Sequence, residues 1–107
     1  MKKSSIVAIA ISALMVANVY AEGNPKFKQG IPYPKVKAEL IKAGWVAVPQ
    51  KNECGLTCDS LRSKGIKEVE DCADSGVMPC VFIFKNPSGK TVGVITQGED
   101  FAFKAYR

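Results

Sequence analysis

Four cysteines and the absence of histidine decide most of the chemistry open to this chain. The cysteines are Cys54, Cys58, Cys72 and Cys80. Without histidine, neither a Ser-His-Asp nor a Cys-His catalytic arrangement can form. Cys54 and Cys58 form a C-x-x-x-C motif, whereas thiol-disulfide oxidoreductases use C-x-x-C in a βαβ context. The gaps of three and seven residues also differ from the repeated C-x-x-C pairs of zinc ribbons. We therefore predict no catalytic, cofactor-binding or metal-binding residue, and two structural disulfides.

The pairing of these cysteines is open at the level of sequence, because four cysteines allow three connectivities. Cys72 and Cys80 flank a turn and could join the two sides of a hairpin, while Cys54 and Cys58 could close a small loop. We favour these two local bonds, since they need no assumption about long-range folding.

An acidic stretch provides the other candidate for chemistry: Glu68, Glu70, Asp71 and Asp74. Glu68 and Glu70 would share one face of a strand, and two carboxylates could serve as a general acid and base. Nothing else marks them as catalytic. We favour a solvated acidic edge, which discourages pairing between sheet edges.

The first 21 residues have the pattern of a cleaved signal peptide. Lys2 and Lys3 precede an apolar run at residues 6–17, and the segment ends in Val19-Tyr20-Ala21. The run is too short for a membrane span, which needs about 20 residues, so we expect no stable membrane insertion. Removal of residues 1–21 leaves 86 residues with a net charge of +3 instead of +5. A chain of this length is enough for one small domain. We expect the protein in the periplasm or fully secreted. Export and the lack of an aromatic-interleaved basic motif argue against a nucleic-acid partner.

The remaining chain divides into an arm at residues 22–34 and a single α+β domain at residues 35–107. Proline, glycine and lysine in the arm favour an extended, poorly packed segment. Apolar spacing predicts a helix over residues 35–43, ended by Gly44. A short strand at residues 45–48 and a disulfide-bearing loop at residues 50–65 follow, with a possible helical turn at residues 59–64. Four further strands are predicted at residues 67–72, 80–85, 91–97 and 101–106.

These elements predict one N-terminal helix packed on an antiparallel sheet of about four strands. We expect Trp45 to anchor the core, together with the apolar residues of one sheet face and one helix stripe: Phe82, Phe84, Val92, Val94, Phe101, Phe103, Val36, Leu40 and Ile41. The opposite sheet face would carry Val81, Ile83 and Ile95, which is more apolar than a solvated face should be. Either the loop at residues 50–65 covers it, or it is a binding surface.

Several runs also resemble small uncharacterised exported proteins of Gram-negative bacteria. They are Tyr33-Pro-Lys-Val-Lys-Ala-Glu-Leu-Ile-Lys-Ala-Gly-Trp45, Glu68-Val-Glu-Asp-Cys72, Cys80-Val-Phe-Ile-Phe84, a turn at Gly89, and Thr96-Gln-Gly-Glu99. In that group the equivalents of Cys72 and Cys80 form the recurrent pair, which supports the local pairing. The order of elements is also similar to that of the β-lactamase inhibitor protein and of outer-membrane assembly lipoproteins, which bind other proteins. This likeness is an analogy of fold only.

The sequence thus favours a small periplasmic, non-enzymatic protein that binds an envelope protein or a cell-wall component, as an inhibitor or immunity protein does. The alternatives are a small thiol-redox or hydrolytic enzyme and an envelope stress protein without a specific partner. No cofactor is predicted, and the oligomeric state is left open.

Overall fold

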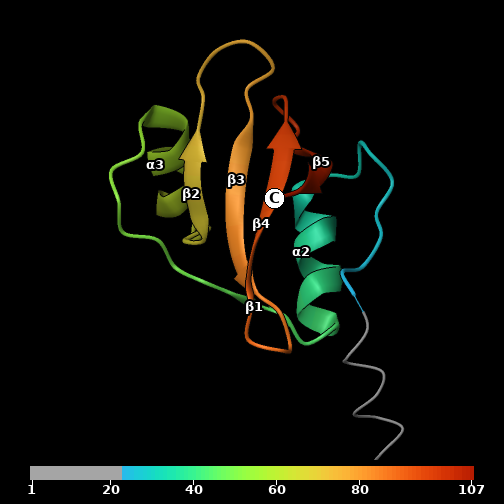
Figure 1. The fold of residues 1–107 in the computed structure, drawn as a ribbon. Coiled ribbons are helices and arrows are strands. Elements are labelled where there is room, and N and C mark those ends of the chain that lie inside the picture. The colour runs from blue at the N-terminus through green and yellow to red at the C-terminus, as the bar shows by residue number, and fades with distance from the viewer. Residues whose placement is uncertain (1–22) are drawn as a thin grey trace, which may run out of the picture.

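A computed structural model describes residues 23–107 and shows two helices and a five-stranded antiparallel sheet (Figure 1). The predicted signal peptide at residues 1–21 lies outside the described residues. The elements are helix α2 at Tyr33–Lys42, strand β1 at Val46–Ala47, helix α3 at Leu56–Ser63, and strands β2 at Val69–Cys72, β3 at Cys80–Lys85, β4 at Thr91–Gln97 and β5 at Ala102–Tyr106. An α+β fold with two disulfides is therefore confirmed. No helix within residues 23–107 is long and apolar enough to cross a membrane.

Strand β3 is the centre of the sheet, with β4 and then β5 on one side and two short strands on the other. Both β1 and β2 pair with β3, β1 near Lys85 and β2 near Cys80, so they share one edge end to end. The expected count of about four strands was too low because the two-residue β1 joins this edge. Phe82 pairs with Val94 and Phe84 with Val92, which places four apolar side chains on one face.

Helix α2 packs on that face, as the apolar spacing predicted. Pro34 stands in its first turn, and its buried side chains are Tyr33, Val36 and Leu40. The Tyr33 ring stacks on Phe82 with centroids 3.8 Å apart. The helix begins at Tyr33 instead of Lys35, and the expected core residue Ile41 is 49% exposed because it projects beside the buried stripe.

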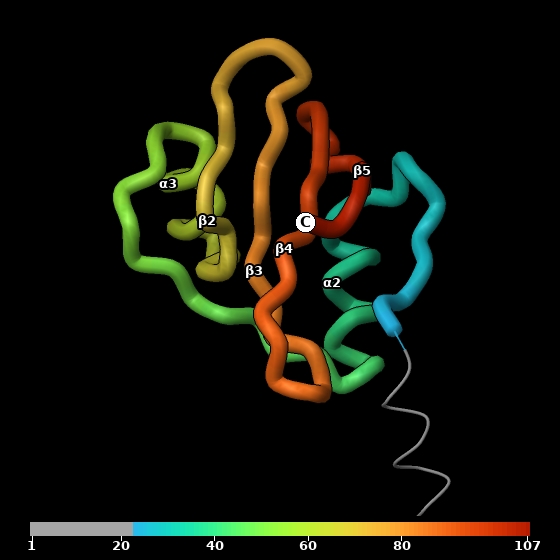
Figure 2. The backbone as a smooth tube through the Cα atoms, in the orientation of Figure 1, coloured from blue at the N-terminus to red at the C-terminus, as the bar shows by residue number. Residues whose placement is uncertain are grey.

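Helix α3 is a correction to the predicted single helix, because it forms within the segment expected to be a loop. It follows Gly55, whose φ of 92° suits glycine, and it has no side-chain N-cap that would have marked its start. Cys58 and Leu61 are buried in the same core cluster as Phe82 and Val36. Both helices cover one face of the sheet, α3 near β2 and α2 nearer β5 (Figures 1 and 2). The predicted helix, α2, is also not N-terminal, since an extended segment precedes it.

The arm before α2 is extended but better packed than expected. The Gly30 amide donates to the Phe103 carbonyl at 3.0 Å, and the Phe103 amide donates to the Ile31 carbonyl at 2.7 Å. The Phe27 ring also meets the Phe103 ring edge to face, with centroids 5.3 Å apart. These contacts cover the edge strand β5.

The predicted core is otherwise confirmed. Trp45 is 4% exposed, and Phe82, Phe84, Val92, Val94 and Phe103 are buried, while Phe101 is half-buried. A register shift next to Thr96 puts Tyr106 on the same side as Phe103, with ring centroids 5.4 Å apart.

Candidate functional site

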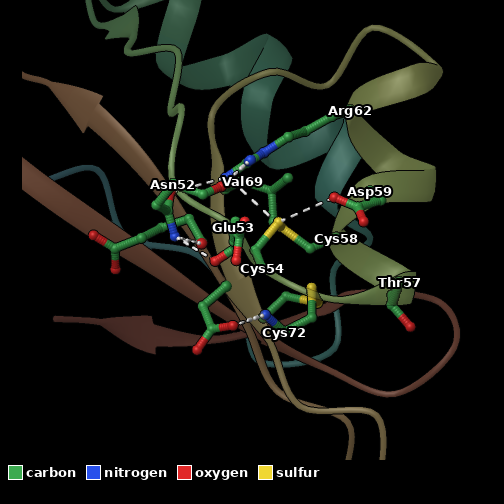
Figure 3. The surroundings of a disulfide bond; sticks show 12 residues. Asn52, Glu53, Cys54, Thr57, Cys58, Asp59, Arg62, Val69 and Cys72 are labelled. Carbon is green, nitrogen blue, oxygen red and sulfur yellow. Dashed lines mark hydrogen bonds between the residues drawn. A yellow bond between two sulfur atoms is a disulfide. The ribbon is translucent and has the colours of Figure 1, made fainter.

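The two disulfides lie towards the same end of the sheet. Cys54 bonds Cys58 and Cys72 bonds Cys80, so the predicted local pairing is confirmed and no described cysteine is free. The first bond closes the start of α3, and Figure 3 shows it beside Val69 and Cys72 of β2. The second bond joins the base of the loop between β2 and β3. Each staple therefore fixes the shape of one loop.

Arg62 fixes the first of these loops to the sheet. Its guanidinium donates to the Val69 carbonyl of β2 from Nε at 3.2 Å and from Nη2 at 2.8 Å, and Nη2 also donates to Asn52 Oδ1 at 3.0 Å (Figure 3). The Asn52 amide group in turn donates to the Glu70 carbonyl at 2.9 Å. The chain before Cys54 is thus held along the outer side of β2.

Three loops meet at this end of the molecule. The Thr57 hydroxyl donates to Asp74, which connects α3 to the loop between β2 and β3. The Gly98 amide donates to the Val77 carbonyl at 2.8 Å, which connects that loop to the turn between β4 and β5. We call residues 53–60, 71–80 and 97–101 together the stapled end (Figure 2, the ends of the loops above the sheet).

The stapled end exposes apolar side chains that its own loops do not cover. Leu56 is 83% exposed and Val77 is 60% exposed. A groove of about 270 Å³ runs along α3 from Leu56 to Lys64, with Phe101 as its opposite wall.

Two residues at the stapled end have strained backbone. Met78 and Phe101 both have a φ of 50°, and they are the only non-glycine residues with positive φ within residues 23–107. The left-handed region is unfavourable for side chains with a Cβ atom, and such strain persists only where the surroundings impose it. At Phe101 the surroundings are two hydrogen bonds, from its amide to the Gly98 carbonyl at 3.0 Å and from the Tyr33 amide to its carbonyl at 2.9 Å.

Exposed acidic side chains are concentrated at the stapled end. The stapled end contains no lysine or arginine, although residues 23–107 as a whole are net positive. Six acidic residues there are all exposed, and none of them belongs to an ion pair within the described chain: Glu53, Asp59, Asp71, Asp74, Glu99 and Asp100. Three exposed lysines lie at the opposite end, where α2 ends and β3 turns into β4: Lys42, Lys85 and Lys90. Lys64 lines the groove beside Leu56.

The predicted binding surface at Val81, Ile83 and Ile95 lies on the sheet face away from the helices. Helix α3, which forms within the loop at residues 50–65, packs on the opposite face. Instead, the Arg107 side chain crosses Gly93, where an added Cβ would stand 3.2 Å from Arg107 Nε, and pairs with Glu70 at 3.0 Å. Gly93 is the partner of Ile83 across the strands, and Ile83 is only 3% exposed. Val81 and Ile95 are half-buried.

Glu68 departs from the solvated acidic edge that the sequence predicted, whereas Asp71 and Asp74 are exposed and Glu70 is half-buried. Glu68 and Glu70 also do not share a face. Glu68 is 2% exposed, accepts a hydrogen bond from the Tyr33 hydroxyl and pairs with Lys37 Nζ at 2.8 Å. A register shift between Val69 and Asp71 breaks the alternation, so Glu70 meets Arg107 on the outer face. Burial, followed by the hydrogen bond and the charge of Glu68, raises the pKa of Tyr33 above its ordinary value of 10.0.

Sequence reasoning missed the residues that make the stapled end distinctive. Leu56 stands between two cysteines, and Glu99 and Asp100 follow Gly98 in a turn, so each signal was present in isolation. Only the topology brings them together, because Gly98 lies 42 positions after Leu56 in the chain. No protein-family model, curated protein or solved structure significantly matches this chain.

Proposed function

We propose that this chain is an exported, non-enzymatic protein of a Gram-negative envelope that binds another protein through the stapled end. The observation that carries the proposal is Leu56, which is 83% exposed at the centre of a five-residue loop closed by the Cys54–Cys58 disulfide. Exposure of a large apolar side chain to water is unfavourable, so a partner that buries Leu56 would gain free energy. The disulfide fixes the loop before binding and so reduces the conformational entropy that is lost on binding.

Three further features support the same surface. Val77 is exposed in the second stapled loop, and Phe101 adds an aromatic wall to the groove beside Leu56. Apolar and aromatic side chains of this kind supply the anchors of protein interfaces. The two disulfides indicate an oxidising compartment, which fits a partner in the periplasm or outside the cell.

The test compares four forms of the protein as bait in an envelope extract from the cells that export it. Wild type and Leu56→Ser/Val77→Ser differ at the stapled end. Ile41→Ser/Val46→Ser is the matched control, since these side chains are 49% and 61% exposed elsewhere on the molecule. We expect a protein that wild type and the control retain and that the Leu56→Ser/Val77→Ser variant loses at least about tenfold, the effect of about 1.4 kcal/mol. A Leu56→Met variant, which keeps an apolar anchor, should retain it.

The proposal fails if every protein captured by wild type is captured equally by Leu56→Ser/Val77→Ser. It also fails if Ile41→Ser/Val46→Ser is equally damaging, because the contact would then be a general apolar one. Thermal unfolding of each bait shows that a lost interaction is not a lost fold, which we expect for exposed positions.

A thiol-redox protein is the second candidate, favoured by the position of one disulfide at the start of a helix. Cys54 is half-buried and Cys58 is fully buried, so only one sulfur is open to an attacking thiol. Intact mass after alkylation separates the two functions. We expect no alkylated cysteine before reduction in protein recovered from its compartment, whereas selective labelling of Cys54 and Cys58 would favour the redox function.

A further inference from the structure

We infer that the partner presents a basic surface, so that the stapled end recognises a cationic protein although this chain is itself net positive. The inference rests on the proposed function and names the chemical class of its partner. It is carried by the charge around the exposed apolar residues, which is independent of their hydrophobicity.

The six exposed carboxylates are distributed over the three segments of the stapled end, two of which carry Leu56 and Val77. Asp59 follows Leu56 in the first turn of α3, Asp74 precedes Val77 in its loop, and Glu99 and Asp100 stand in the neighbouring turn. None of the three loop segments carries a lysine or arginine, and Lys64 is the one cationic residue that lines the groove. The surface therefore has an apolar centre and an acidic rim, the arrangement in which rim charge selects a partner of opposite sign and increases the rate of encounter.

The distribution of these carboxylates favours a broad macromolecular partner over a metal ion. A bound cation needs several oxygen ligands converging on one point. Within residues 23–107 no three acidic or cysteine side chains are close enough together to hold an ion. The charges are spread across three loops instead, so they can face several cationic side chains of a protein surface.

The chain is net positive, so the positions of its lysines decide whether a basic partner is repelled. A uniformly basic protein would repel a basic partner at long range. Here Lys42, Lys85 and Lys90 lie at the other end of the sheet, and Lys64 is the one lysine that lines the groove beside Leu56. Charges further apart than the Debye length of about 8 Å at physiological salt are largely screened from one another. A cationic protein approaching the stapled end therefore meets a locally negative potential.

The experiment uses the protein that wild type captures and that Leu56→Ser/Val77→Ser loses, purified and measured for association kinetics at several salt concentrations. The acidic rim is tested with Glu99→Gln/Asp100→Asn, because neither side chain makes a described hydrogen bond or ion pair. Its matched control is Glu39→Lys, which changes the net charge by the same +2 on the exposed side of α2.

We expect a partner with an excess of lysine and arginine at its contact surface. At low salt, Glu99→Gln/Asp100→Asn should reduce the association rate constant between about threefold and tenfold, and Glu39→Lys should leave it within about twofold. At high salt the wild-type and amide forms should converge, because screening removes the contribution of the rim.

The inference is overturned, and the proposed function stands, if a partner requires Leu56 and Val77 but binds the amide variant and wild type at the same rate. A contact that disappears when divalent cations are chelated would also overturn it, because a metal ion would then be bridging two acidic surfaces. If no protein depends on Leu56 and Val77, the proposed function fails and the inference fails with it.

Discussion

Removing Lys37 should cost more stability than removing the charge of Glu68, although both changes break the same ion pair. The two side chains differ in their access to water: the Lys37 side chain is 32% exposed and that of Glu68 is 3% exposed, with Nζ and Oε2 2.8 Å apart. At an effective dielectric constant of about 20, unit charges at this separation attract by about 6 kcal/mol before the cost of desolvation is counted. The stability that is lost when one partner is removed therefore depends on whether the remaining charge is buried or exposed to water.

Lys37→Met keeps most of the apolar stem and leaves the Glu68 carboxylate buried, with the Tyr33 hydroxyl as its one described side-chain partner. Leaving an uncompensated buried charge should cost about 3 kcal/mol of unfolding free energy. Glu68→Gln keeps the volume and an acceptor for the Tyr33 hydroxyl, while Lys37 can turn its ammonium to water. We expect a loss of about 1 kcal/mol, similar to that of one hydrogen bond.

Urea unfolding with the disulfides intact measures both losses, provided that the slope with denaturant stays constant. The double variant Lys37→Met/Glu68→Gln should resemble Glu68→Gln alone, which would give a coupling of about 3 kcal/mol between the two positions. Equal losses from the two single variants would refute the reasoning, because the burial of Glu68 would then carry no uncompensated cost. A loss below about 0.5 kcal/mol for Lys37→Met would refute it equally.

Two further predictions concern the alkaline pH range and the outer face of the sheet. Burial raises the pKa of Tyr106 to about 12, and the pKa of Tyr33 lies further above the ordinary value of 10.0. Because both folded-state pKa values exceed the unfolded ones, protonation of these tyrosines contributes stability that is complete below pH 10. The contribution of Tyr106 is lost as pH rises through 12. Absorbance of tyrosinate should show neither residue ionising near pH 10, and Tyr106→Phe should flatten the loss of stability between pH 10 and 12; normal titration of both would contradict the burial. Gly93→Ala should lower the unfolding free energy by about 1–3 kcal/mol, since the added Cβ would stand 3.2 Å from both Arg107 Nε and Val81 Cγ1. The control Gly23→Ala places its Cβ in open space and should leave the unfolding free energy unchanged in the same urea titration.

The sequence predicted the parts of this fold that depend on local signals. Apolar spacing after Pro34 marked α2, and β-branched and aromatic runs marked β3 and β4. The disulfide pairing also followed from local spacing. In each case the residues that decide the structure are neighbours in the chain, so no knowledge of the topology was needed.

The errors arose where tertiary contacts override local pattern. Glu68 directly precedes β2, and its alternation with Glu70 indicated an exposed strand. Its burial is possible because Tyr33 and Lys37 of α2 contact its carboxylate. Helix α3 has eight residues and no side-chain cap, so its stability comes from packing Cys58 and Leu61 into the core. The same limitation hid the stapled end, whose three loops are distant in sequence and meet only because β2, β3 and β4 are adjacent.

The stapled end concentrates features that work against stability, and the staples offset them. Exposed Leu56 and Val77 gain nothing from folding, Met78 and Phe101 hold unfavourable backbone conformations, and neighbouring carboxylates repel one another. In the chain-entropy account, loops of five and nine residues closed by disulfides each contribute about 2–3 kcal/mol. These contributions are of the same order as two strained residues at about 1–3 kcal/mol each. The cost is therefore localised where the groove and the acidic rim coincide, while the opposite end of the sheet, without disulfides or positive-φ side chains among its described residues, needs no such support.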